Sequence, residues 1–139
     1  MATITHLDWL DGMLGNPTHS VVDLNGDDID MSLLDETDSG TIDNTFVDYD
    51  EIDTNVVHST DIAGFTSITG GVVTMTAAST FSAVSGDAAD FLTVWKNSGS
   101  PATSPLILTW DSATSGIPVT PNSGDIIATW GSNVLVTLA

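Results

Sequence analysis

The chain of 139 residues has no cysteine, and it has one basic side chain, Lys96, against nineteen aspartates and glutamates. Without cysteine it cannot form disulfides, thiolate metal sites or a thiol nucleophile. With a single cation it lacks the side chains that bind phosphates, so we expect no nucleic-acid partner. Fifteen of the acids lie within the first 61 residues. This asymmetry predicts a solvated acidic face, a face that meets a basic partner, or adaptation to high salt.

Long apolar runs are also missing. No run approaches the length of a membrane span, and the first residues lack the basic and apolar regions of a signal peptide. We therefore expect no membrane partner and no secretion signal. The hydrophobic content of 41% is that of a globular chain, and the length fits one domain, residues 1–139.

What the chain does have is a set of short apolar runs that end at or beside a tryptophan. Residues 91–96, 105–110 and 125–130 are such runs, each bounded by Gly, Pro, Asn or Ser. Their length and their content of Val, Ile, Thr and Trp favour β-strands. Alternation predicts which side chains of the last two runs share a core-facing side, namely Leu106, Leu108 and Trp110, and Ile126, Ala128 and Trp130.

Further strands are predicted on both sides of these runs. Residues 20–24 and 29–34 flank Asn25-Gly26, a strong signal for a β-hairpin. The remaining predicted strands are 65–68, 72–76, 80–84 and 133–139, with the last one forming a hairpin with 125–130. Together they predict an all-β fold, a single antiparallel β-sandwich of about eight short strands with a short N-terminal helix or arm.

Two segments fall outside this strand pattern. Residues 1–18 form the predicted arm or helix, with Thr5 as the N-cap of a helix over 5–14. Residues 35–61 form a long acidic loop with scattered apolar side chains and one irregular helical turn, and long loops of this kind are often functional. Aromatic and Met side chains are enriched at interfaces. The candidate partner-contacting residues are Trp9, Leu10, Met13, Phe46, Tyr49 and Ile52.

The second half of the chain resembles a known family. Val94-Trp-Lys-Asn-Ser-Gly-Ser-Pro-Ala-Thr-Ser-Pro-Leu-Ile107 and Asp111-Ser-Ala-Thr-Ser-Gly-Ile-Pro-Val-Thr-Pro-Asn-Ser-Gly-Asp-Ile126 are similar to two loops of small proteins of tailed bacteriophages. The family usually has Asp-Thr where this chain has Asn97-Ser98. The resemblance covers about residues 70–138 and carries no catalytic residues. It implies a structural role in the virion, with assembly in the host cytoplasm.

Motifs that carry chemistry are weak. Asp23-Leu-Asn-Gly-Asp27 begins like a calcium loop, but Asp28 and Leu34 stand where such loops have Gly and an acid, so we expect a β-turn. The three histidines show no pairing at ligand spacing, and no nucleophile elbow or phosphate loop is present. We expect no metal, no cofactor and no enzymatic activity. The four tryptophans favour core packing over stacking on sugars.

These observations predict a non-enzymatic phage virion structural protein, in the first place a decoration (cement) protein on the outer capsid surface. Its expected partners are the major capsid protein or other virion proteins, and further copies of itself in a homo-oligomer. The alternatives are a tail or head-fibre component that contacts the host surface, and a carbohydrate-binding module. The copy number in purified virions distinguishes a cement protein from a tail component.

Overall fold

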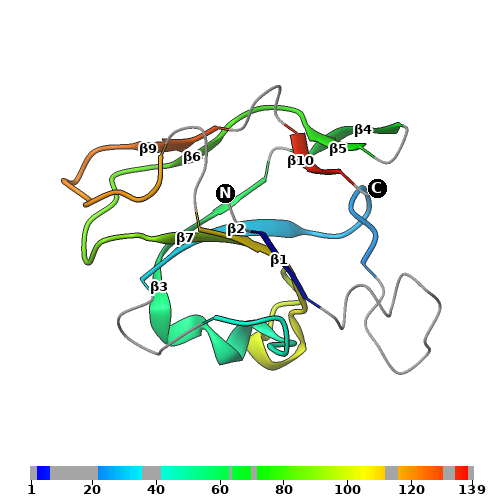
Figure 1. Cartoon of the computed structure of the whole chain (residues 1–139), viewed down its shortest axis with the longest axis horizontal. Helices are drawn as coiled ribbons and strands as arrows, with labels where there is room; N and C mark the ends of the chain where they lie inside the picture. Colours follow the sequence, from blue (N-terminus) through cyan, green and yellow to red (C-terminus); the bar gives the residue numbers. More distant parts are fainter. Residues whose placement is uncertain are drawn as a thin grey trace.

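The computed structural model describes residues 3–6, 22–35, 42–62, 64–69, 72–111, 116–129 and 134–137. These residues form ten strands and three single-turn 3-10 helices, η1 to η3 (Figure 1). The strands are β1 (Thr3–Thr5), β2 (Ile29–Leu34), β3 (Val56–Asp61), β4 (Phe65–Thr69), β5 (Val72–Met75), β6 (Ser79–Phe81), β7 (Phe91–Lys96), β8 (Leu106–Trp110), β9 (Ile126–Ala128) and β10 (Val134–Thr137). The helices are η1 (Tyr49–Glu51), η2 (Asp53–Asn55) and η3 (Pro101–Thr103). None of these turns has the length or apolar character that a helix crossing a membrane requires.

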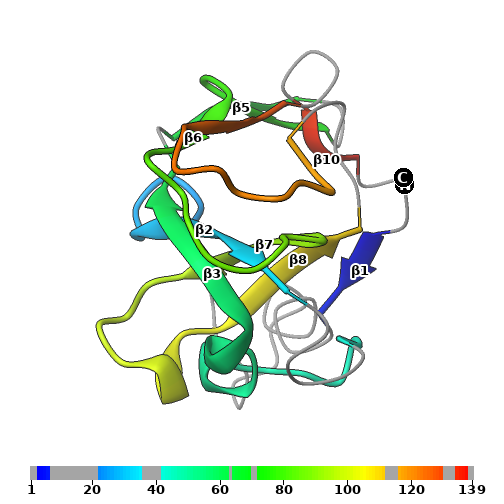
Figure 2. The ribbon, with the colours of Figure 1, turned by 90° about the vertical axis from the view of Figure 1, so that its left-hand side faces the viewer.

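The strands divide among three antiparallel sheets. The largest has five strands in the order β1-β8-β7-β2-β3, and the others are β10-β5-β4 and the pair β6-β9. Figures 1 and 2 show the two smaller sheets on one side of the five-stranded sheet. The prediction of an all-β antiparallel fold is confirmed. The β-sandwich is a finer statement, and it stays a prediction because the strands form three sheets and not two.

The first core cluster lies between the five-stranded sheet and the smaller sheets. It takes Ile29, Met31 and Leu33 from β2, which alternate along the strand and share one face of it. Other strands of the large sheet add further apolar side chains, among them Trp110 of β8. The smaller sheets add Val73, Met75, Phe81, Ile126 and Ala128. The alternation visible in the sequence therefore identifies most of this core.

A second, smaller core cluster lies on the opposite face of the large sheet. It joins Leu34, Trp95 and Leu106 of the sheet to Ile42 and Ile52 of the acidic segment. Every residue of β2 is buried, because both faces of the strand are covered. The segment over 42–55 is thus a covering layer of the sheet, and it lies below the sheet in Figure 1.

A β-bulge corrects one face assignment. In the pairing of β7 with β8, Val94 stands opposite Leu108 but Trp95 stands opposite Leu106, so Ile107 is an extra residue in β8. An extra residue reverses the alternation beyond it. Leu106 consequently lies in the second cluster, while Leu108 and Trp110 lie in the first. The prediction that all three share a face was wrong. Trp130 lies outside the described residues.

Both predicted hairpins were wrong as well. Residues 24–26 form the expected turn, with the Asp23 carbonyl accepting from the amides of Gly26 and Asp27. However, residues 22–28 contain no strand, and β2 pairs with β3 and β7. At the other end of the chain, β9 pairs with β6 and β10 pairs with β5. Alternation in the sequence indicates which face of a strand is buried. It does not specify which other strand pairs with it.

The acidic segment and the N-terminus also differ from expectation. The helical turn predicted within 35–61 corresponds to η1 and η2, but residues 56–61 form strand β3, which pairs along β2. Two valines and a threonine give these residues the strand character that the surrounding acids obscure in the sequence. Thr5 is the last residue of β1, which pairs with β8, and not a helix N-cap. The rest of the predicted helix, residues 7–14, lies outside the described residues.

Candidate functional site

The candidate partner-contacting residues fall into three groups. Trp9, Leu10 and Met13 lie outside the described residues. Phe46 and Tyr49 are half-buried and pack against the second core cluster, each leaving part of its side chain accessible. Ile52 is only 1% exposed and belongs to that cluster, so its side chain is part of the core in the folded chain.

Local hydrogen bonds explain why the segment around Tyr49 folds as a tight turn. The Glu51 carboxylate accepts from the backbone amides of Val47 and Asp48, which fixes the start of η1. The Tyr49 amide donates to the Ser104 carbonyl at 2.8 Å, and the Leu106 amide donates to the Val47 carbonyl at 2.8 Å. The segment is therefore tied to the start of β8 by backbone bonds, which gives its aromatic side chains fixed positions.

A buried histidine fastens the same segment to the sheet. His6 is fully buried, and its ring lies 3.0 Å from the Phe46 carbonyl through Nδ1 and 2.9 Å from Thr109 Oγ1 through Nε2. A carbonyl only accepts, so Nδ1 carries the proton and donates to it. Burial lowers the pKa of His6 below its usual value, which favours this neutral form. The ring therefore links β8 to the acidic segment through two hydrogen bonds.

An aromatic pocket opens where η1 meets the loop between β7 and β8. The rings of Tyr49 and Trp95 are stacked with centroids 3.9 Å apart and planes 24° from parallel. They line a pocket of about 200 Å³ together with residues of the β7–β8 loop, including Asn97, Gly99 and Pro101. The accessible lining is almost entirely carbon. We call this the aromatic pocket.

The loop that completes the aromatic pocket is held by its own side chains. Ser104 Oγ donates to the Ser100 carbonyl at 2.8 Å and accepts from the Ser98 amide at 3.1 Å. The Gly99 amide donates to Asn97 Oδ1 at 3.0 Å, and Gly99 has φ +85°, a conformation that favours glycine. The wall of the pocket is therefore formed before any partner arrives.

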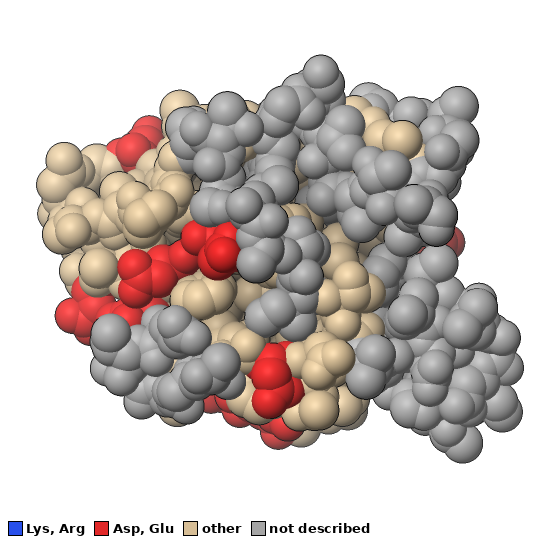
Figure 3. All heavy atoms as spheres, in the orientation of Figure 1, with Lys and Arg blue, Asp and Glu red and all other residues tan. Residues whose placement is uncertain are grey.

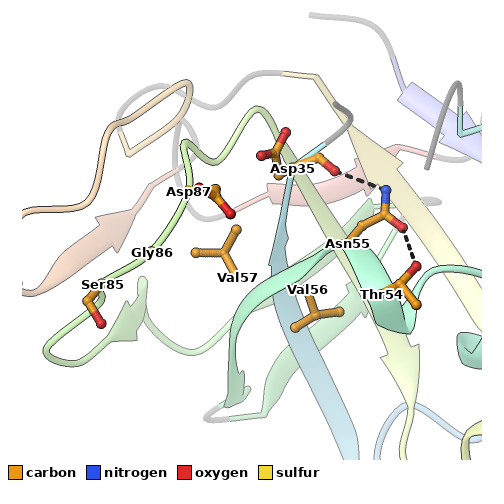
Figure 4. Close-up of a pocket in the computed structure, with 8 residues that line it drawn as sticks. All are labelled: Asp35, Thr54, Asn55, Val56, Val57, Ser85, Gly86 and Asp87. Atoms are coloured by element: carbon orange, nitrogen blue, oxygen red, sulfur yellow. Dashed lines mark hydrogen bonds between the residues drawn. The ribbon is translucent and has the colours of Figure 1, made fainter. Parts of the chain in front are cut away.

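A second pocket lies at the other end of the same segment. Figure 4 shows that it is lined from three places, the end of β2, residues 54–57 and the loop between β6 and β7. Asp35 and Asp87 contribute carboxylates, and Asn55 donates through Nδ2 to the Asp35 carbonyl at 2.9 Å. We call this the polar pocket, and its two acids favour a cationic group over an anionic one.

The charges near the aromatic pocket are almost all negative. Lys96 is paired with Asp27, with Nζ 3.0 Å from Oδ2. Asp30 is 6% exposed and accepts from Asn97 Nδ2 at 3.0 Å through Oδ2, while its Oδ1 has no hydrogen-bond partner among the described residues. Burial raises the pKa of Asp30 to about 6, and the neighbouring Asp61 carboxylate contributes to this rise. On the face in Figure 3, acidic side chains reach the surface and no described Lys or Arg is visible.

Metal-ligating groups do not converge in the described part of the chain, where no three His, Asp or Glu side chains could hold an ion together. The loop at Asp23 is a closed turn, in which Asp27 Oδ2 accepts from the Asp23 amide at 2.8 Å and Asp23 Oδ1 accepts from the Asn25 amide at 3.0 Å. These carboxylates stabilise the turn itself.

Part of the site does not follow from the sequence. The strand pattern predicts Trp95 in the core, and it is buried with its indole N–H donating to Ser32 Oγ at 2.9 Å, but its ring also lines the aromatic pocket. The pattern predicts the loop over 97–104 only as a turn. Its closely spaced serines at 98, 100 and 104 are the available signal, because hydroxyls at such spacing bond within a loop and hold it rigid.

Comparison with known proteins identifies no relative of this chain. No known protein family matches this chain, and no curated protein matches it significantly. The acidic segment supplies Tyr49 to the aromatic pocket and residues 54–57 to the polar pocket.

Proposed function

We propose that the chain is a non-enzymatic structural protein of a tailed-phage virion, and that it decorates the outer surface of the capsid. The resemblance over about residues 70–138 supports the virion part of the proposal. The major capsid protein is the expected partner, and copies of the chain associate on the shell. The proposed location on the capsid rests on the acidic surface of the chain, described next.

The observation that carries this proposal is that one acidic segment lines both pockets. Residues 42–55 cover one face of the large sheet and present Asp43, Asp50, Glu51 and Asp53 to solvent. Rigid aromatic side chains with a charged rim are the usual composition of a protein-binding surface. A rim of one sign favours a partner surface of the opposite sign and accelerates its docking. A capsid surface with a basic patch fits these requirements.

A carbohydrate-binding module is the second candidate function, because stacked aromatic rings line the aromatic pocket. Stacked tyrosine and tryptophan rings are able to receive a sugar ring, as a head fibre or tail component that contacts the host surface would require. Glycan binding by the isolated protein is the observation that would support this alternative.

Binding to capsids tests the proposal. Capsids assembled without this chain are mixed with the purified protein, and the bound fraction is measured by sedimentation. We expect saturable binding in proportion to the major capsid protein, weakened in Asp50→Asn/Asp53→Asn and unchanged in Asp125→Asn. Asp125 is an exposed acid remote in sequence from the segment, and its Oδ1 contact with the Ala83 amide is one that Asn reproduces. Absence of binding by the unmodified protein would reject capsid decoration.

A further inference from the structure

We propose that the aromatic pocket is a receptor for an arginine side chain presented by a partner protein. The proposal names the chemical group that the acidic segment recognises on its partner, and so deepens the proposed function. It rests on the proposed function only for the identity of the partner protein. Three properties of the pocket lead to this ligand: its rigidity, its lining and its charge.

The pocket is rigid before binding. Trp95 is fixed by the bond from its indole N–H to Ser32 Oγ, and Tyr49 is fixed by its amide bond to Ser104 and by a contact of 3.4 Å between its hydroxyl and Ser59 Oγ. A ligand that enters loses its own freedom but does not have to order the receptor. Such a site is suited to one protruding side chain.

The lining excludes sugars as the preferred ligand. A sugar ring that stacks on aromatic residues also brings hydroxyls, each of which needs a hydrogen-bond partner when water is removed. The accessible lining of the pocket is almost entirely carbon, so these partners are missing from it. The indole N–H of Trp95 is already bonded to Ser32 Oγ.

The charge excludes an anion and disfavours a purely apolar side chain. Tyr49 is followed directly by the exposed acids Asp50 and Glu51, and Asn97 in the pocket wall is bonded to the Asp30 carboxyl. Lys96, the one basic residue of the chain, is engaged with Asp27. A leucine would place carbon against the rings but would bring no positive charge to these acids.

An arginine side chain satisfies all of these conditions. Its planar guanidinium stacks on aromatic faces and is weakly hydrated, which allows it to enter a carbon-lined pocket. Its methylene groups cover the apolar wall near Pro101, and its charge faces the acidic rim. Lysine carries the same charge, but its compact ammonium is strongly hydrated and gains less from stacking.

A titration of the full chain with four small probes tests the proposal. The probes are the capped peptides Ac-Gly-Arg-Gly-NH2, Ac-Gly-Lys-Gly-NH2 and Ac-Gly-Leu-Gly-NH2, and methyl glucoside, and the readout is the NMR signals of the Trp95 indole N–H and the Gly99 amide. We expect saturable shifts of both signals with the arginine peptide, binding at least threefold weaker with lysine, and no saturation with leucine or glucoside. Asp125→Asn changes an exposed acid outside the pocket and should bind the arginine peptide within twofold of the unmodified chain.

Three outcomes overturn the proposal. Tighter binding of the leucine peptide would make the pocket a receptor for an apolar side chain, and saturation by methyl glucoside would make it a sugar site. Equal affinities of the arginine and lysine peptides, measured by these two signals, would show attraction to positive charge alone and no recognition of the guanidinium. These measurements use no capsid, so arginine binding without capsid binding would sustain the pocket and reject the proposed function.

Discussion

Trp110 is the largest side chain of the first core cluster, and it is 1% exposed. Truncating it in Trp110→Ala leaves a cavity that its neighbours fill only in part, so we expect the free energy of unfolding to fall by roughly 3–5 kcal/mol. Urea unfolding measures the change. Ile127→Ala is the control, because Ile127 is 50% exposed on β9 and its truncation should change stability by less than about 0.5 kcal/mol. Equal midpoints for Trp110→Ala and the unmodified chain would contradict the core assignment.

The titration of the buried Asp30 carboxyl makes the free energy of unfolding depend on pH. Its pKa is about 6 in the folded chain and 3.8 for an unperturbed aspartate, so between these values the folded state holds a proton that the unfolded state has released. The contribution of Asp30 to the free energy of unfolding therefore decreases as the pH rises from 4 through 6, by at most roughly 3 kcal/mol. Below pH 4 both states are protonated and the penalty disappears.

Asp30→Asn tests this sign. The amide is neutral at every pH and keeps an oxygen for Asn97 and a donor for Asp61. We expect the variant to be more stable than the unmodified chain at pH 7.5, with the advantage shrinking at pH 4.5, as measured by urea unfolding at both values. Asp125→Asn removes an exposed acid and should show no such trend. An Asp30→Asn chain that loses stability at pH 7.5 would mean that the ionised carboxylate is favourable in the fold.

At the scale of elements, we expect the N-terminal strand and the residues after it to have separable roles. Deleting residues 2–14 removes β1 from the edge of β8 and removes His6, whose two ring bonds join β8 to the acidic segment. Each buried partner left unsatisfied costs about 1–3 kcal/mol, so we expect the deletion to lower the urea midpoint strongly. A deletion that unfolds at the same midpoint would show that β1 and His6 contribute little.

The triple variant Trp9→Ala/Leu10→Ala/Met13→Ala tests the predicted arm without removing β1. It should unfold at the midpoint of the unmodified chain and bind capsids less tightly in the sedimentation assay. A triple variant that unfolds early would place these side chains in the core. One that keeps its full capsid affinity would leave Tyr49 and its pocket as the principal contact.

The elements that the sequence predicted are those set by local pattern. Strands β2, β7 and β8 match their predicted ranges closely, because alternation and flanking Gly, Pro and Ser act within a few residues. Their partners were not predictable, since pairing joins residues far apart in the chain, as β10 with β5 does. The bulge at Ile107 was equally invisible, because it depends on the register against β7.

The candidate site was predictable only in its location. The acidic composition indicates residues 35–61, and Tyr49 of this segment lines the aromatic pocket. Its contact with a partner stays a prediction. Ile52 faces inward because the segment closes over the sheet, and no pattern within the segment distinguishes the inner from the outer side. The contribution of Trp95 and of the loop over 97–104 arises from tertiary contact alone.

For the whole molecule, the net charge of −18 predicts sensitivity to salt. The acids of the first half repel one another with one base in the chain to offset them, and ions shorten the range of this repulsion to roughly 8 Å at physiological ionic strength. We expect the melting temperature to rise between 5 mM and 150 mM sodium chloride. Potassium chloride is the control for a specific ion effect and should give the same rise. A flat profile would contradict close clustering of the acids.

The number and position of copies in the virion test the central proposal most directly. Virions of the phage that the proposed function implies are purified and imaged by cryo-electron microscopy, and the chain is quantified against the major capsid protein. We expect density for its five-stranded sheet on the outer capsid surface, with copies in fixed proportion to capsid subunits. A few copies confined to the tail or to a fibre, or none in the particle, would contradict capsid decoration.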